Sequence, residues 1–156
     1  MPEQKLTNLL NLPNLEVLGY ESTEDGVVLD IKPTLKVAIC PECRKPSASL
    51  HDYDEARLIR DLSLFGRKSY LRLRGRRFEC ESCQNAFTER LEWIAFDSSY
   101  TRRFEAYVFS LCRKNTVQDV SQMLELGYEA VEGLFKRQAK KDTGIPKKDR
   151  PSNQSG

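Results

Sequence analysis

The chain has 156 residues, of which 39% are hydrophobic and 31% are charged. This composition is typical of a soluble protein with modest cores, and no apolar run approaches the roughly 20 residues that a membrane helix needs. The first ten residues lack the basic and apolar regions of a secretory signal. We therefore expect no membrane association and a cytoplasmic location, where paired cysteines more often bind metal than form disulfides.

The net charge of +2 is unevenly distributed along the chain. Residues 1–55 carry 5 Lys and Arg against 10 Asp and Glu, a net of −5. Residues 56–113 carry 12 against 7, a net of +5, and residues 114–156 carry 8 against 6, a net of +2. The positive charge of the later segments indicates an anionic partner, although charge alone is a weak signal.

The first predicted element is a β-hairpin. The apolar positions of Leu15–Thr23 partly alternate, Asp25-Gly26 follows, and a second apolar run extends over Val27–Lys32. Two such runs around Asp-Gly are typical of two antiparallel strands joined by a tight turn. Because an isolated hairpin is marginal in water, we expect this one to pack on the segment that follows.

Two Cys-x-x-Cys motifs come next, Cys40-Pro-Glu-Cys43 and Cys80-Glu-Ser-Cys83. Four thiolates hold a zinc ion tetrahedrally in closed structural sites, and two such motifs each supply one pair of ligands. The 36 residues between the motifs exceed the commoner spacing of about 15–20. Strand-like segments in this interval could form a hairpin that brings the motifs together, so the sequence predicts one structural Zn²⁺ in a ribbon-like module.

Three alternatives to this zinc site remain open. They are two disulfides, a thioredoxin-type redox motif, and a site in which His51, the only histidine, replaces one cysteine. The fifth cysteine, Cys112, lies on an apolar helical stripe, and we interpret it as a small core residue.

A basic segment precedes the second motif, and no acid interrupts it between Arg67 and Arg77. Its cations are Arg67, Lys68, Arg72, Arg74, Arg76 and Arg77. Alternation along a strand places Tyr70, Arg72 and Arg74 on one face. Such a face can neutralise phosphates and release counterions. The alternative is a solvated outer face, or an edge strand protected by its charge.

From Tyr100 the pattern is helical. Phe104, Tyr107, Val108, Leu111 and Cys112 lie on one face of an amphipathic helix. Thr116-Val-Gln-Asp119 resembles a capping box and predicts the start of a second helix, which Gly127 ends. A third helix follows, and Gly144 and Pro146 end helical structure.

The last two helices have the pattern of a helix-turn-helix. Val120, Leu124, Leu126, Val131 and Leu134 have the spacing of buried residues in two helices that cross at a short turn. Ser121 is small, as the crossing requires, whereas Glu125 occupies the turn position usually taken by glycine. A simple helical hairpin is the alternative.

Several motifs in this order resemble the N-terminal region of the ISL-type bacterial insertion-sequence transposases, over roughly residues 15–140. They are Cys40-Pro-Glu-Cys43, Ile59-Arg-Asp-Leu62, Tyr70-Leu-Arg-Leu-Arg74, Arg77-Phe-Glu-Cys80 with Cys83, Phe87-Thr-Glu-Arg90 and the helical region after Tyr100. The resemblance implies that the four cysteines bind zinc and that residues 117–137 read DNA. Within that unit we expect Tyr128 and Glu129 to face base edges, and Lys136 and Arg137 to clamp the backbone.

Transposases of this family continue into a DDE catalytic domain, in which three carboxylates bind two metal ions. After the third helix only a short tail remains here, so we expect a truncated or split transposase that binds insertion-sequence DNA in the bacterial cytoplasm without catalysing transposition. The expected partners are double-stranded DNA and a separately encoded catalytic chain. The alternative function is a zinc-stabilised interaction module whose basic face binds an acidic protein.

The sequence thus predicts an α+β protein. Residues 1–97 would form the β-hairpin and the zinc-ribbon-like module, residues 98–142 a three-helix DNA-binding unit, and residues 143–156 a disordered tail. The sequence leaves the oligomeric state and the DNA sequence recognised open.

Overall fold

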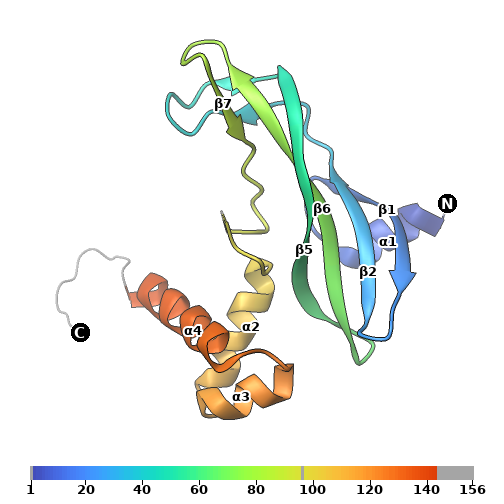
Figure 1. Ribbon diagram of the computed structural model, residues 1–156, viewed down its shortest axis with the longest axis vertical. Helices are drawn as coiled ribbons and strands as arrows, with labels where there is room; N and C mark the ends of the chain where they lie inside the picture. Colours follow the sequence, from blue (N-terminus) through green and yellow to red (C-terminus); the bar gives the residue numbers. More distant parts are fainter. Residues whose placement is uncertain (1, 96, 144–156) are drawn as a thin grey trace. The chain divides into compact units, whose positions relative to one another are not determined.

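The computed structural model describes residues 2–95 and 97–143, and it describes the side chains of residues 4–95 and 97–140. The chain forms two compact units, which divide after Arg102 (Figure 1). The first unit contains the strands and the second contains helices, so the predicted α+β class is confirmed. Among the described residues, no helix is long and apolar enough to cross a membrane.

The first unit is built on a five-stranded mixed sheet (Figure 1). Its strands are β1 (Leu15–Ser22), β2 (Val27–Pro33), β5 (Leu50–Leu64), β6 (Arg67–Cys80) and β7 (Asn85–Thr88). The order is β1-β2-β6-β5, with β7 also paired to β6, and only the β2–β6 pair is parallel. The predicted N-terminal hairpin is therefore present, and it packs as expected by adding β2 to the edge of β6.

A helix that the sequence did not predict, α1 (Pro2–Leu10), covers one face of this sheet. The core beneath it comprises Leu10, Leu15, Val17, Leu29, Ile31, Ile59, Leu71, Leu73, Leu91, Trp93 and Ile94. Alternate residues of β6 fill this core, whereas Tyr70, Arg72 and Arg74 lie between the buried positions. The predicted common face of these three side chains is thus the outer face of the sheet.

The long interval between the cysteine motifs forms a hairpin of β5 and β6, as anticipated. Phe65 and Gly66 make its two-residue turn, both with positive φ, 52° and 79°. Paired positive φ values at the two turn residues are typical of the type I′ turn, whose twist matches that of the strands. The hairpin carries the chain out from the first motif and back to the second.

The second unit contains α2 (Arg102–Cys112), α3 (Val117–Leu124) and α4 (Tyr128–Thr143). The predicted three-helix unit is therefore present. Its buried residues include Val108, Val120, Val131 and Leu134, and the rings of Phe109 and Phe135 stack at 5.2 Å. Beyond Thr143, the tail expected at the C-terminus lies outside the described residues.

Candidate zinc centre and nucleic-acid interface

Each cysteine motif lies at the tip of a β-hairpin. Cys40 and Cys43 lie between β3 (Ala38–Ile39) and β4 (Pro46–Ser47), and Cys80 and Cys83 lie between β6 and β7. The residue after each second cysteine, Arg44 or Gln84, has a positive φ. Its N–H donates to the carbonyl of the first cysteine, at 2.9 Å in one motif and 2.7 Å in the other. The two tips are thus equivalent turns that direct their thiols to one point.

The four sulfur atoms lie within 4.8 Å of one another. The Sγ–Sγ distances are 3.9 Å between Cys40 and Cys83 and 3.4 Å between Cys43 and Cys80. Ligands at about 2.3 Å from a tetrahedral zinc ion would be about 3.8 Å apart. The cluster therefore fits one zinc ion, and four cysteine ligands leave no open position for a substrate. The site is structural.

The local electrostatics also favour a cation. N–H groups of Cys43 and Glu42 donate to Cys40 Sγ and lower the pKa of that thiol to about 7. The neighbouring thiols, Cys43 first, together with desolvation raise the pKa of Cys83 to about 12. Four thiolates repel one another at these distances unless a cation lies between them. Zinc supplies that charge and deprotonates coordinating thiols.

The cluster brings together all four predicted ligands and excludes the other candidates as ligands. His51 is an exposed residue of β5 and does not belong to the cluster. Cys112 is partly buried on α2, and burial raises the pKa of its thiol. All five cysteines lie among the described residues, and each is a free thiol there.

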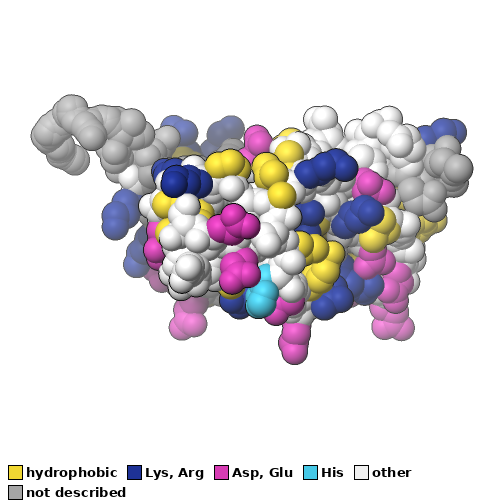
Figure 2. Space-filling model, turned by 90° about the horizontal axis from the view of Figure 1, so that it is seen from above, with side chains coloured by type: hydrophobic (Ala, Val, Ile, Leu, Met, Phe, Trp, Pro, Cys, Tyr) yellow, Lys and Arg dark blue, Asp and Glu magenta, His cyan; other side chains and the backbone are white. Residues whose placement is uncertain are grey.

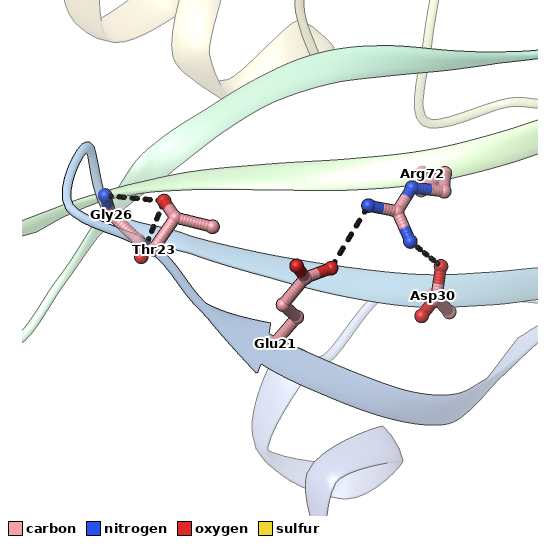
Figure 3. Close-up of polar contacts among 5 residues, drawn as sticks. All are labelled: Glu21, Thr23, Gly26, Asp30 and Arg72. Atoms are coloured by element: carbon pink, nitrogen blue, oxygen red, sulfur yellow. Dashed lines mark hydrogen bonds and ion pairs between the residues drawn. The ribbon is translucent and has the colours of Figure 1, made fainter.

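The structure places acids of other segments beside four of the six cations in the basic segment. Arg72 contacts Asp30 at 2.8 Å and Glu21 at 3.2 Å, and these contacts raise the pKa of Arg72 (Figure 3). The other pairs are Lys68–Asp25 at 3.1 Å, Arg76–Glu89 at 2.6 Å and Arg77–Asp52 at 3.5 Å. Acidic and basic side chains are also intermixed on the face seen in Figure 2. The uninterrupted run of cations in the sequence is thus largely neutralised in space.

Arg67 and Arg74 differ, because neither forms an ion pair with a described residue. Arg67 donates to Ser22 Oγ at 3.0 Å, and Arg74 donates to the carbonyl of Asp54 at 3.1 Å. The guanidinium of Arg74 also lies 5.2 Å from the ring centre of Tyr53. The phosphate contacts expected of the six cations remain predictions, and these two side chains retain the most positive charge for them.

Sequence reasoning missed two further cations on the same face. Lys32 and Lys36 line a hollow of about 750 Å³ together with Arg72, Arg74 and Arg76. Lys32 lies on β2, and Lys36 lies in the segment that follows this strand. Only the parallel pairing of β2 with β6 brings them near the arginines, and local sequence carries no signal for that pairing.

In the helical unit, local signals position the turn. Thr116 Oγ1 accepts from the N–H of Asp119 at 3.0 Å and caps α3 as predicted. Glu125 ends α3 in the left-handed conformation, with φ 54° and ψ 47°. Ser121 Oγ donates to the carbonyl of Leu126, and the N–H of Leu126 donates to the carbonyl of Ser121 at 3.0 Å. Ser121 therefore stabilises the turn through these hydrogen bonds, and its small side chain permits the two helices to cross closely.

Helix α4 exposes its first turn. Tyr128 is 51% exposed, and Glu129 is exposed beside it. Toward the other end, Lys136 lies 3.7 Å from Glu132, and Arg137 contacts the buried carboxylate of Glu105 at 2.9 Å. Arg137 thereby links α4 to α2. The contacts expected between these four side chains and DNA remain predictions.

Comparison with known families identifies both parts of the chain. Residues 36–83 match the zinc finger of the transposases of IS204, IS1001, IS1096 and IS1165. Residues 89–139 match the helix-turn-helix domain of transposase family ISL3. A transposase for insertion sequence element IS1001 from Bordetella parapertussis is 33% identical over 106 residues, which are 68% of this chain and 26% of that protein. No solved structure matches the chain.

Proposed function

We propose that this chain, whose residues 36–83 and 89–139 match the zinc-finger and helix-turn-helix domains of ISL3-type transposases, binds double-stranded DNA. One observation carries the proposal. The turn between α3 and α4 has the capped start, tight crossing and left-handed residue of a helix-turn-helix, and the first turn of α4 is exposed. A recognition helix enters the major groove with its first residues toward the base edges.

The side chains of α4 divide between two roles. Tyr128 and Glu129 begin the helix and would face base edges, where a glutamate can accept from cytosine. Lys136 is 73% exposed near the end of the helix and would contact the phosphate backbone. Because Glu129 and Glu132 repel phosphate, we propose that sequence-specific affinity is modest and that charge dominates binding.

Zinc would stabilise the fold of this protein. It would join the β3–β4 and β6–β7 tips, since β3 and β4 pair over only two residues each and have no other strand partner. The free energy of zinc binding then becomes folding free energy of the module.

We further propose that insertion-sequence ends are the natural DNA, and that this chain binds them in the bacterial cytoplasm without cleaving or joining them. A separately encoded chain would supply catalysis. In the described part of the chain, the four cysteines are the only group of three or more His, Cys, Asp or Glu side chains close enough to share an ion. Cleavage or strand transfer on an end-bearing duplex, supported by magnesium or manganese, would contradict this proposal.

The test is a titration of labelled duplex at several salt concentrations. We expect the logarithm of the binding constant to fall linearly with the logarithm of the salt concentration. Lys136→Ala should reduce the slope by about one unit. The matched control is Lys5→Ala on α1, which removes an exposed lysine outside the helical unit and should leave the slope unchanged.

Absence of duplex binding by the wild-type protein at low salt would favour the alternative function, an interaction module for an acidic protein. That alternative is supported by Leu18, Tyr20 and Leu58, which are 48–61% exposed on the strands of the sheet. Retention of the full slope by Lys136→Ala would contradict the backbone role assigned to α4.

A further inference from the structure

The hollow on the outer face of the sheet is formed within the first unit alone. Strands β1, β2, β5 and β6 and the segment after β2 line its volume of about 750 Å³. This is within the range of cavities that hold small ligands or a few monomers of a polymer. It is distinct from α4, to which duplex binding was assigned above.

The lining of this hollow carries positive charge. It includes five cations, Lys32, Lys36, Arg72, Arg74 and Arg76, and two acids, Glu16 and Asp30, a net of +3. The carboxylates of Glu21, Asp30 and Glu89 engage Arg72 and Arg76. Lys32, Lys36 and Arg74 form no ion pair with a described residue, so their charge is available to an anionic ligand.

The same hollow also presents apolar and aromatic surface. Leu18 is 50% exposed, Leu35 is 43% exposed and Tyr53 is 49% exposed. The guanidinium of Arg74 lies over the Tyr53 ring at 5.2 Å, which makes an exposed stacked pair of one planar cation and one aromatic ring. A ligand that fits this lining needs phosphate-like charge and flat apolar faces together.

We propose that this hollow binds a short single-stranded segment of nucleic acid. Phosphates would lie on Lys32 and Lys36, and a base would stack on the Tyr53–Arg74 pair. A duplex keeps its base faces stacked inside the helix, whereas a single strand offers them to aromatic and guanidinium planes. The proposal rests on the proposed function only in taking DNA as the ligand.

The probe is fluorescein-labelled oligo-dT of twelve residues, titrated by anisotropy at several salt concentrations. Lys32→Ala and Lys36→Ala should each weaken binding and reduce the salt slope by about 0.7, the value per phosphate of a single strand. Lys5→Ala is their control, with no expected change. Tyr53→Ala should weaken binding about tenfold or more with the slope unchanged. Tyr20→Ala, an exposed tyrosine of β1 that does not line the hollow, is the control for this loss.

The outcomes separate this inference from the proposed function. If the wild-type protein binds duplex but not oligo-dT at low salt, the inference is wrong and the proposed function stands. If Lys136→Ala weakens oligo-dT binding as much as Lys32→Ala, the helical unit holds the single strand and the inference is wrong. If poly-L-glutamate binds in place of oligo-dT and Lys32→Ala weakens it, the occupant is an acidic protein. If the protein binds oligo-dT but not duplex, the inference stands and the proposed duplex binding is wrong.

Discussion

The ion pair between Arg76 and Glu89 tests whether an arginine of the basic segment stabilises the fold or is available to bind phosphate. The side chains are 14% and 3% exposed. Arg76 donates to both carboxylate oxygens of Glu89, at 2.6 and 2.8 Å, and to the carbonyl of Leu35 at 2.7 Å. Its guanidinium also lies 5.2 Å from the ring centre of Phe78. From this geometry we predict that Arg76 contributes to the stability of the fold and little to phosphate binding.

Replacing Arg76 with methionine leaves the buried carboxylate of Glu89 without its cation. Removal of one partner from a buried ion pair costs about 3–5 kcal/mol, and we expect a loss near 3 kcal/mol because the arginine is slightly exposed. The double variant Arg76→Met/Glu89→Leu removes both charges and should lie within about 1 kcal/mol of the wild-type protein. Arg74→Met, on the same strand but exposed, should cost about 0.5 kcal/mol or less.

Urea unfolding with saturating zinc measures these differences. Trp93, the only tryptophan, is buried in the core of the first unit and reports on its unfolding by fluorescence. Salt titrations with duplex complete the comparison, because Arg76→Met should leave the slope unchanged at a temperature where the variant is folded. The reasoning is refuted if Arg76→Met costs no more than Arg74→Met, or if the double variant is as unstable as the single one.

Two further predictions concern the zinc site and the helical turn. We expect one zinc per chain by elemental analysis, and Cys80→Ser should lose this zinc and have a lower thermal midpoint of unfolding. Cys112→Ser is the control and should retain the metal. Zinc should also dissociate as pH falls, because protons compete for the thiolates. Full zinc content in Cys80→Ser would contradict the site. Glu125→Gly should raise the free energy of unfolding of the helical unit by about 1 kcal/mol, because glycine adopts the left-handed conformation of this residue without strain. Urea titrations followed by circular dichroism measure this change. A loss of stability would contradict this account.

The zinc ligands and the helical unit could be predicted because their signals are local. Each Cys-x-x-Cys motif predicts a turn from four residues alone. The hairpin of β5 and β6 then brings the two motifs together. Thr116 and Asp119 are three residues apart, and their capping contact forms within one helical turn. Glu125 was recognised as a departure from glycine, and the structure places it in the conformation that favours glycine.

The role of the basic segment could not be predicted in the same way. Alternation correctly placed Tyr70, Arg72 and Arg74 on one face, but the acids that pair with this segment come from elsewhere in the chain. Glu21 and Asp30 reach Arg72 through the pairing of β1 with β2 and of β2 with β6. Helix α1 was also missed, although Leu6, Leu9 and Leu10 have the i, i+3, i+4 spacing of a helix, and Leu6 and Leu10 pack on the core of the sheet. Residues distant in sequence thus decide which cations remain available.

Strand β6 connects these features physically. Its Leu71 and Leu73 lie in the core, Arg72 and Arg74 line the outer hollow, and Cys80 at its end binds zinc. The middle of β6 pairs with β2 and β5, and its last third pairs with β5 and β7, so the strand has two neighbours in both places. The Arg76–Glu89 ion pair and the zinc ligand Cys80 provide further contacts in its last third. We therefore expect the metal and the buried ion pair to stabilise the strand that positions the cations, without themselves taking part in the proposed binding of nucleic acid.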